Sequence, residues 1–112
     1  MSPTLEELSR ACERLRRLPE ARWQQPPLPP LGARPVDAPV RPGPALEDLV
    51  RDAIARVMHA DAKARGVQVI PTDVHAFALP DVLEALSRSA VASGDGDAAR
   101  VVAAVTRETR DW

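Results

Sequence analysis

Apolar residues recur at helical spacing at the start of the chain, with charged residues between them. The repeat runs every three or four positions: Leu5, Leu8, Cys12 and Leu15. This spacing gives a helix one apolar face. We expect Thr4 to cap this helix and Pro19 to end it at about residue 18. A short turn over residues 20–24 is expected to follow and to present Trp23.

The middle of the chain carries the most regular amphipathic pattern. Its apolar positions are Leu46, Leu49, Val50, Ala53, Ile54, Val57 and Met58. Pro44 suits the first turn of this second helix, and Gly66 is a natural C-terminal cap. Two pairs of opposite charges lie four residues apart on the polar face: Glu47 with Arg51, and Asp52 with Arg56. We expect both pairs to support the helix.

The C-terminal part predicts two more helices joined by a short link. Their inward residues are Val82, Leu83, Leu86 and Ala90 in the first, and Val101, Val102, Val105 and Trp112 in the second. The first begins at Pro80 and ends near Ala92, and Asp97 is expected to cap the second. Because the link at Gly94 is short, we expect an antiparallel hairpin.

Residues 67–79 show no clear helical repeat. Val67, Val69 and Ile70 have strand character, and Pro71 ends whatever they form. Residues 74–79 are then either a second short strand or a buried loop. The fold class expected is mostly α, a small domain of three to four helices with a C-terminal helical hairpin and an extended proline-rich segment. A short β-ribbon is left open.

The proline-rich segment covers residues 26–44, of which eight are proline. It favours polyproline II and, at about 3.1 Å per residue, could extend over roughly 60 Å. The apolar side chains Leu28, Leu31, Val36 and Val40 suggest that it lies along a surface. That surface belongs either to its own helices or to a partner with an aromatic groove. The chain thus divides into an N-terminal amphipathic helix (1–25), a proline-rich arm or linker (26–44) and a helical core (45–112).

The composition predicts a core that buries little apolar area, because most of its side chains are small. Alanine occurs 19 times, whereas the aromatic residues are only Trp23, Phe77 and Trp112. Small side chains remove little area from water, so a self-sufficient monomer is harder to stabilise. We therefore expect the chain to bind another protein chain or itself. The basic residues are 14 Arg and one Lys, a bias typical of a GC-rich bacterial genome.

Charge and candidate chemistry are sparse. The net charge is −1, which gives no field that attracts nucleic acid. The single Cys12 and the two histidines, His59 and His75, show no metal-ligand spacing. His59 is interpreted as a surface residue, and Cys12 as a buried structural thiol. His75 and Phe77 could line a crevice. We expect no cofactor, no metal and no enzymatic activity.

Two functions remain open on these grounds. The first is a non-catalytic accessory subunit or regulator that docks on a larger protein through helix one and the proline-rich arm. The partner-binding residues it predicts are Leu5, Leu8, Cys12, Leu15, Trp23, Leu28, Leu31 and Val36. The alternative is a small dimeric DNA-binding regulator or antitoxin-like protein, in which the last two helices form a helix-turn-helix. The absence of a signal peptide or an apolar membrane span predicts a cytoplasmic location.

Overall fold

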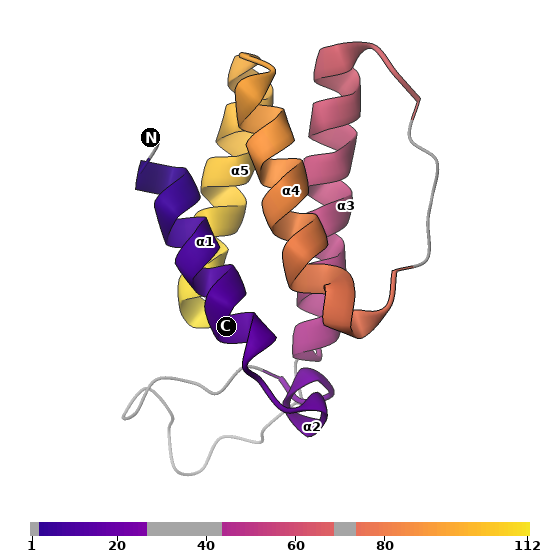
Figure 1. Cartoon of the computed structure of the whole chain (residues 1–112). Coiled ribbons are helices and arrows are strands. Elements are labelled where there is room, and N and C mark those ends of the chain that lie inside the picture. Colours follow the sequence, from indigo (N-terminus) through magenta and orange to yellow (C-terminus); the bar gives the residue numbers. More distant parts are fainter. Residues whose placement is uncertain (1–2, 27–43, 69–73) are drawn as a thin grey trace, which may run out of the picture.

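The described parts of the chain are helical. A computed structural model describes residues 3–26, 44–68 and 74–112 (Figure 1). Its elements are α1 (Pro3–Arg16), α2 (Glu20–Trp23), α3 (Leu46–Arg65), the 3₁₀ turn η1 (Ala76–Ala78), α4 (Leu79–Ala92), α5 (Gly96–Glu108) and the 3₁₀ turn η2 (Thr109–Asp111). The mostly α class predicted from the sequence is confirmed. The residues that carry the predicted proline-rich arm, 27–43, lie outside the described ranges.

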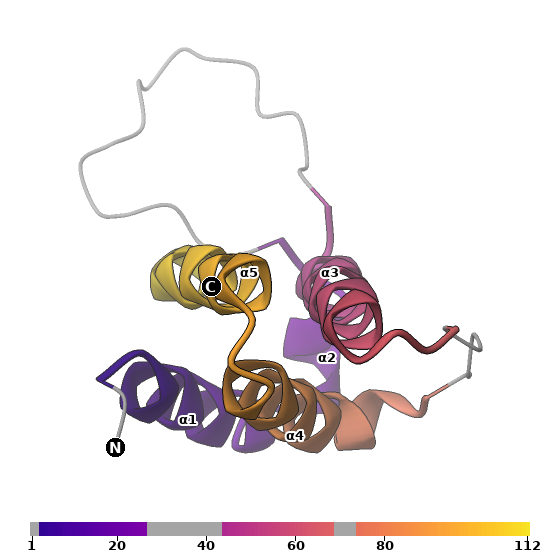
Figure 2. The same cartoon turned by 90° about the horizontal axis from the view of Figure 1, so that it is seen from above.

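The four long helices lie side by side as a bundle. In Figure 1, α4 runs upwards and turns through a short link into α5, which runs downwards, so the predicted antiparallel hairpin is present. α3 also runs upwards, and the chain returns to the lower end before α4 begins. Seen from above, α1 and α4 form one layer, and α5 and α3 form the other (Figure 2). The short helix α2 lies at the lower end, against α3.

The helix ends follow local capping chemistry. Gly66 adopts the left-handed conformation (φ 68°) at the end of α3, and its N–H group donates to backbone carbonyls of the last turn, as the sequence predicts. The predicted cap of α5 is wrong by two positions. Asp95 rather than Asp97 precedes the helix, and its carboxylate accepts from the N–H groups of residues 97 and 98 at 2.9 and 3.0 Å. Asp95 is the aspartate whose carboxylate reaches the N–H groups of the first turn, which have no carbonyl partner within the helix.

The segment before α4 is a tight turn and not a strand. His75 caps η1, because its Nδ1 atom accepts the N–H group of Phe77 at 3.3 Å. α4 begins directly afterwards at Leu79, with Pro80 inside its first turn. The alternative of a second strand over residues 74–79 is therefore wrong. The remaining part of the predicted ribbon, residues 69–73, lies outside the described residues.

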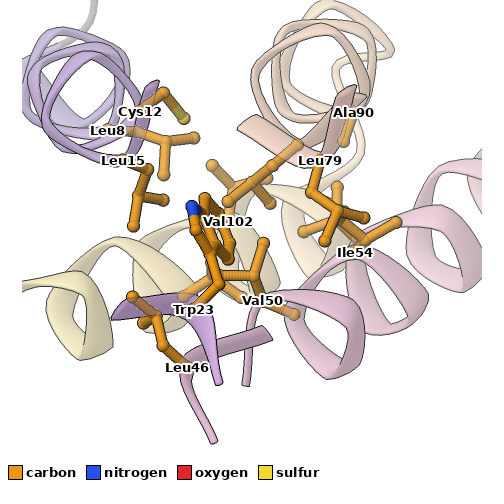
Figure 3. Close-up of a cluster of buried hydrophobic side chains, with 14 of the residues drawn as sticks. Leu8, Cys12, Leu15, Trp23, Leu46, Val50, Ile54, Leu79, Ala90 and Val102 are labelled. Carbon is orange, nitrogen blue, oxygen red and sulfur yellow. The ribbon is translucent and has the colours of Figure 1, made fainter. Parts of the chain in front are cut away.

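The core lies between the four long helices and is closed by Trp23. Figure 3 shows the indole of Trp23, from α2, pointing in among Leu15 of α1, Val50 of α3 and Val102 of α5. Trp23 is 4% exposed, so the prediction that the turn presents this side chain is wrong. The indole is large enough to fill the end of a bundle whose other core residues are mostly Leu, Val and Ala.

This packing covers the apolar stripes of all four long helices. Core residues with at most 6% exposure come from each of them, and they include Leu8, Leu46, Leu83 and Val102. Among the described residues, the large apolar side chains that remain exposed are Val67 and Phe77. Within the described residues, the core, which the sequence predicts to bury little apolar area, is therefore closed by the chain itself. This core consists mostly of small and medium-sized residues from the four long helices, and Trp23 closes one end of it.

Candidate functional site

A hollow of about 450 Å³ lies at the lower end of the bundle, between α2, the start of α3 and η1. The residues that line it are Glu20, Trp23, Gln24, Glu47, Arg51, Val74, His75, Ala76 and Phe77. The two ends of the proline-rich segment meet here, because the N–H group of Leu46 donates to the Gln25 carbonyl at 2.9 Å. The hollow therefore combines an open surface with the point at which that segment leaves and rejoins the bundle.

His75 and Phe77 form an exposed aromatic pair on one side of the hollow. Their rings stack with centroids 5.1 Å apart and an interplanar angle of 24°. The hydrogen bond from Phe77 N–H to His75 Nδ1 holds the two residues in register. Nδ1 is the acceptor in this bond and therefore carries no proton in this arrangement. Phe77 is 68% exposed and thus offers an apolar ring to anything that enters the hollow.

Charged groups line the same hollow as this aromatic pair. Glu20 lies in the first turn of α2, and Glu47 in the first turn of α3, where a carboxylate is favoured by the helix dipole. Glu47 accepts from Arg51 at 3.5 Å, which is long for an ion pair. Both predicted i,i+4 pairs of α3 are confirmed, since Arg56 also contacts Asp52 at 3.0 Å. The hollow thus has an apolar side and a polar rim.

The residues predicted to bind a partner through helix one lie elsewhere. Leu8, Cys12, Leu15 and Trp23 are each at most 4% exposed and belong to the core, and Leu5 is half-buried against it. A partner cannot reach these four core side chains while the bundle is intact. The predicted residues Leu28, Leu31 and Val36 lie outside the described residues. His75 and Phe77, which the sequence suggests as residues of a crevice, lie together and line the hollow.

The thiol of Cys12 is expected to be unreactive in this position. Its side chain is fully buried, and burial raises the pKa of its thiol to about 12, with the nearby Glu84 carboxylate acting in the same direction. The thiol therefore stays protonated at neutral pH and is a poor nucleophile. His59 is exposed on α3, as the sequence predicts.

In residues 3–26, 44–68 and 74–112, no group of three or more His, Cys, Asp or Glu residues is arranged to hold a metal ion. No helix in those same ranges combines the length and the apolar character that crossing a membrane requires.

No protein-family model, no curated protein and no solved structure matches the chain. The site is therefore interpreted from its own residues. Sequence reasoning missed Glu20 as a lining residue and treated Glu47 and Arg51 only as a helix-supporting pair. These residues come from segments far apart in the sequence, and no local pattern signals that they share a hollow.

Proposed function

We propose that this protein is a non-catalytic interaction module, an accessory subunit or regulator that docks on a larger protein through the lower end of its bundle. The observation that supports this most is the exposed ring of Phe77, stacked on His75 beside the hollow. Most other large apolar side chains among the described residues are covered, so such a ring is a natural anchor for a partner.

The energetics favour the same end of the molecule. Covering an exposed phenylalanine is worth roughly 2 kcal/mol, and aromatic anchors dominate many interfaces. The pair is also held in advance, because His75 bonds to the backbone of Phe77 and the hollow is backed by the buried Trp23. A surface that needs little ordering loses less entropy when it binds.

The role of helix one changes in this proposal. Its apolar residues stabilise the bundle, so α1 supports the docking end and does not itself meet the partner. The proline-rich segment keeps its predicted role, in which Leu28, Leu31 and Val36 contact the partner. Gln24 and Glu47, close to its two ends, line the hollow. The proline-rich segment and the hollow would therefore contact the same partner.

A peptide library displayed on phage and selected against the purified protein tests the proposal. Selected peptides are then measured by calorimetry against wild type, Phe77→Ala and Val67→Ala. Val67 is the matched control, since it is 59% exposed and follows the opposite end of α3. We expect Phe77→Ala to weaken binding by at least about tenfold and Val67→Ala by less than about twofold. A library without binders, or binders indifferent to Phe77→Ala, would contradict the proposal.

The alternative of a DNA-binding regulator has less support. A helix-turn-helix crosses its two helices at about 90–120°, whereas α4 and α5 form an antiparallel hairpin (Figure 1). Several arginines that could contact phosphate already bond to carboxylates: Arg88 to Glu84, Arg100 to Asp97 and Arg110 to Glu7. A salt-dependent shift of labelled duplex DNA at low ionic strength would reverse this preference.

A further inference from the structure

A second and larger hollow, of about 700 Å³, lies between α3 and α5. These two helices form the layer of the bundle away from α1 and α4 (Figure 2). Much of its floor consists of small apolar side chains: Ala55, Ala60 and Ala64 of α3, and Ala98, Val101 and Ala104 of α5. Short side chains allow another helix to approach to about 8 Å, the close end of the usual interaxial range.

The two rims of this groove carry opposite charge at its upper end. On the α3 side lie the ammonium of Lys63 and the imidazole of His59. On the α5 side lie the carboxylates of Asp95 and Asp97. Within the residues that the structure describes, Lys63 forms no ion pair, and Asp97 has only the exposed Arg100 at 3.3 Å.

The lower end of the groove is already neutralised within the chain. Arg56 of α3 bonds to Glu108 of α5 at 2.7 Å and contacts Asp52 at 3.0 Å. The Arg56–Glu108 pair ties the two helices together, and with the Arg56–Asp52 pair within α3 it leaves little charge for a partner to meet. Recognition by charge would therefore act at the upper rims, where Lys63 and Asp97 lie on opposite sides.

We infer that this groove is the contact surface of a symmetric dimer, and that its occupant is a second copy of this chain. A two-fold axis along the groove places α3 of each copy against α5 of the other. Lys63 then faces Asp97 of the second copy, and the same pair recurs on the other side. A surface with one basic and one acidic rim is complementary to itself in this arrangement, which favours a second copy over an unrelated helix.

The size of the surface sets the strength of this dimer. α3 has 20 residues and is about 30 Å long. α5 has 13 residues and is about 20 Å long, and each helix is about 10 Å wide, so the face is about 500 Å² per copy. The total of about 1,000 Å² is below the range of stable specific interfaces and is typical of weak, transient ones. The dimer should therefore be a weak one that dissociates at micromolar concentration, and its surface is separate from the docking hollow.

Sedimentation of the purified full chain over a range of concentrations tests the inference. Wild type should show a reversible monomer–dimer equilibrium, and Lys63→Glu or Asp97→Lys should each weaken it by at least about tenfold, because each reversal creates two like-charge contacts. An equimolar mixture of the two variants should recover a heterodimer to within about threefold of wild type, since the reversed charges then match.

The mixture makes the experiment independent of damage to the fold, because misfolded variants could not recover by mixing. Arg17→Glu is the control, a charge reversal on the exposed turn after α1 and outside the groove. It should leave the equilibrium unchanged, and circular dichroism should show that all variants are helical. A wild-type monomer at every concentration, or a dimer that neither reversal weakens, or variants that fail to recover on mixing, would overturn the inference.

Discussion

Buried hydroxyl groups differ from one another in how well they are satisfied. Thr106 and Thr109 are both buried, and each donates to a backbone carbonyl of its own helical segment, at 2.7 and 2.5 Å. Ser87 on α4 is also fully buried, but its Oγ atom has no hydrogen-bond partner among the described residues. A buried polar group without a partner costs free energy relative to water. Ser87 is therefore a site at which the sequence departs from the most stable choice.

Replacing Ser87 by alanine should raise the free energy of unfolding by about 1 kcal/mol, because the unsatisfied hydroxyl is removed and little packing volume is lost. Ser89→Ala, two residues along the same helix, is the matched control. Ser89 donates to Asp61 at 3.1 Å and accepts from Arg65 at 3.0 Å, so its loss should cost about 1 kcal/mol. Urea unfolding followed by circular dichroism measures both. A destabilised Ser87→Ala protein would show that the hydroxyl has a stabilising partner.

At the scale of elements, α1 is held in the bundle by polar bonds as well as by its apolar stripe. Glu84 of α4 accepts from Ser9 at 2.7 Å and from Arg16 at 2.5 Å, and its side chain is only 16% exposed. Glu7 accepts from Arg110 beyond the end of α5 at 3.0 Å. These bonds fix α1 on both of its neighbours, so its docking depends on ionised carboxylates.

The pKa values of these carboxyl groups give α1 a pH-dependent attachment. The hydrogen bond from Ser9, followed by that from Arg16, lowers the pKa of Glu84 below its ordinary 4.5. The Arg110 hydrogen bond lowers the pKa of Glu7 in the same way. A lowered folded-state pKa stabilises the fold above the ordinary value, and this stability is lost as the pH falls through the folded-state value.

We therefore expect the free energy of unfolding to fall as the pH is lowered from about 6 to 3. Glu84→Gln should reduce the stability at neutral pH by about 1–2 kcal/mol and should flatten this pH dependence. Glu13→Gln, a change at an exposed glutamate on α1, should leave the slope as in wild type. Urea titrations at several pH values measure the slope of the free energy of unfolding against pH for each variant. An unchanged slope in Glu84→Gln would show that this carboxylate does not link pH to the attachment of α1.

The helices were predictable from the sequence because each carries its own periodicity and its own end signals. The repeat of α3 and its Gly66 cap needed no tertiary information. The turn before α4 was harder to predict, because Val74 and Phe77 have strand propensity and the deciding contact is a side-chain cap by His75. Asp95 and Asp97 are equally good caps by type, and only the exact start of α5 separates them.

At the scale of the whole molecule, the sequence could not show which surface covers which. An apolar stripe on α1 has the same spacing whether it packs on α4 and α5 or on another protein. The local pattern therefore could not decide between these two, and the sequence-based assignment to a partner was wrong. Trp23 was assigned to the surface for the same reason. His75 and Phe77 could be anticipated as part of a crevice because they are close in sequence. The rim residues Glu20 and Glu47 could not, since the fold alone brings them there.

In the described residues, the bundle covers its own apolar stripes, and the contacts proposed above lie at its lower end and on one face. The docking hollow is at the lower end, and the α3–α5 groove is on a side face. This arrangement requires that α1 remain packed, because Trp23 follows it directly and closes the core. The account as a whole therefore depends on α1 being part of the core and not a binding arm.

The reactivity of Cys12 towards a thiol reagent such as DTNB tests that claim most directly, because the thiol is fully buried on α1. We expect Cys12 to react at least about a thousandfold more slowly in native buffer than in concentrated urea, and its exposure should coincide with the loss of helical signal. A protein with Cys12→Ala and Val67→Cys supplies an exposed control thiol that should react at once. Rapid reaction of Cys12 in the folded wild-type protein would mean that α1 detaches, and would contradict the account.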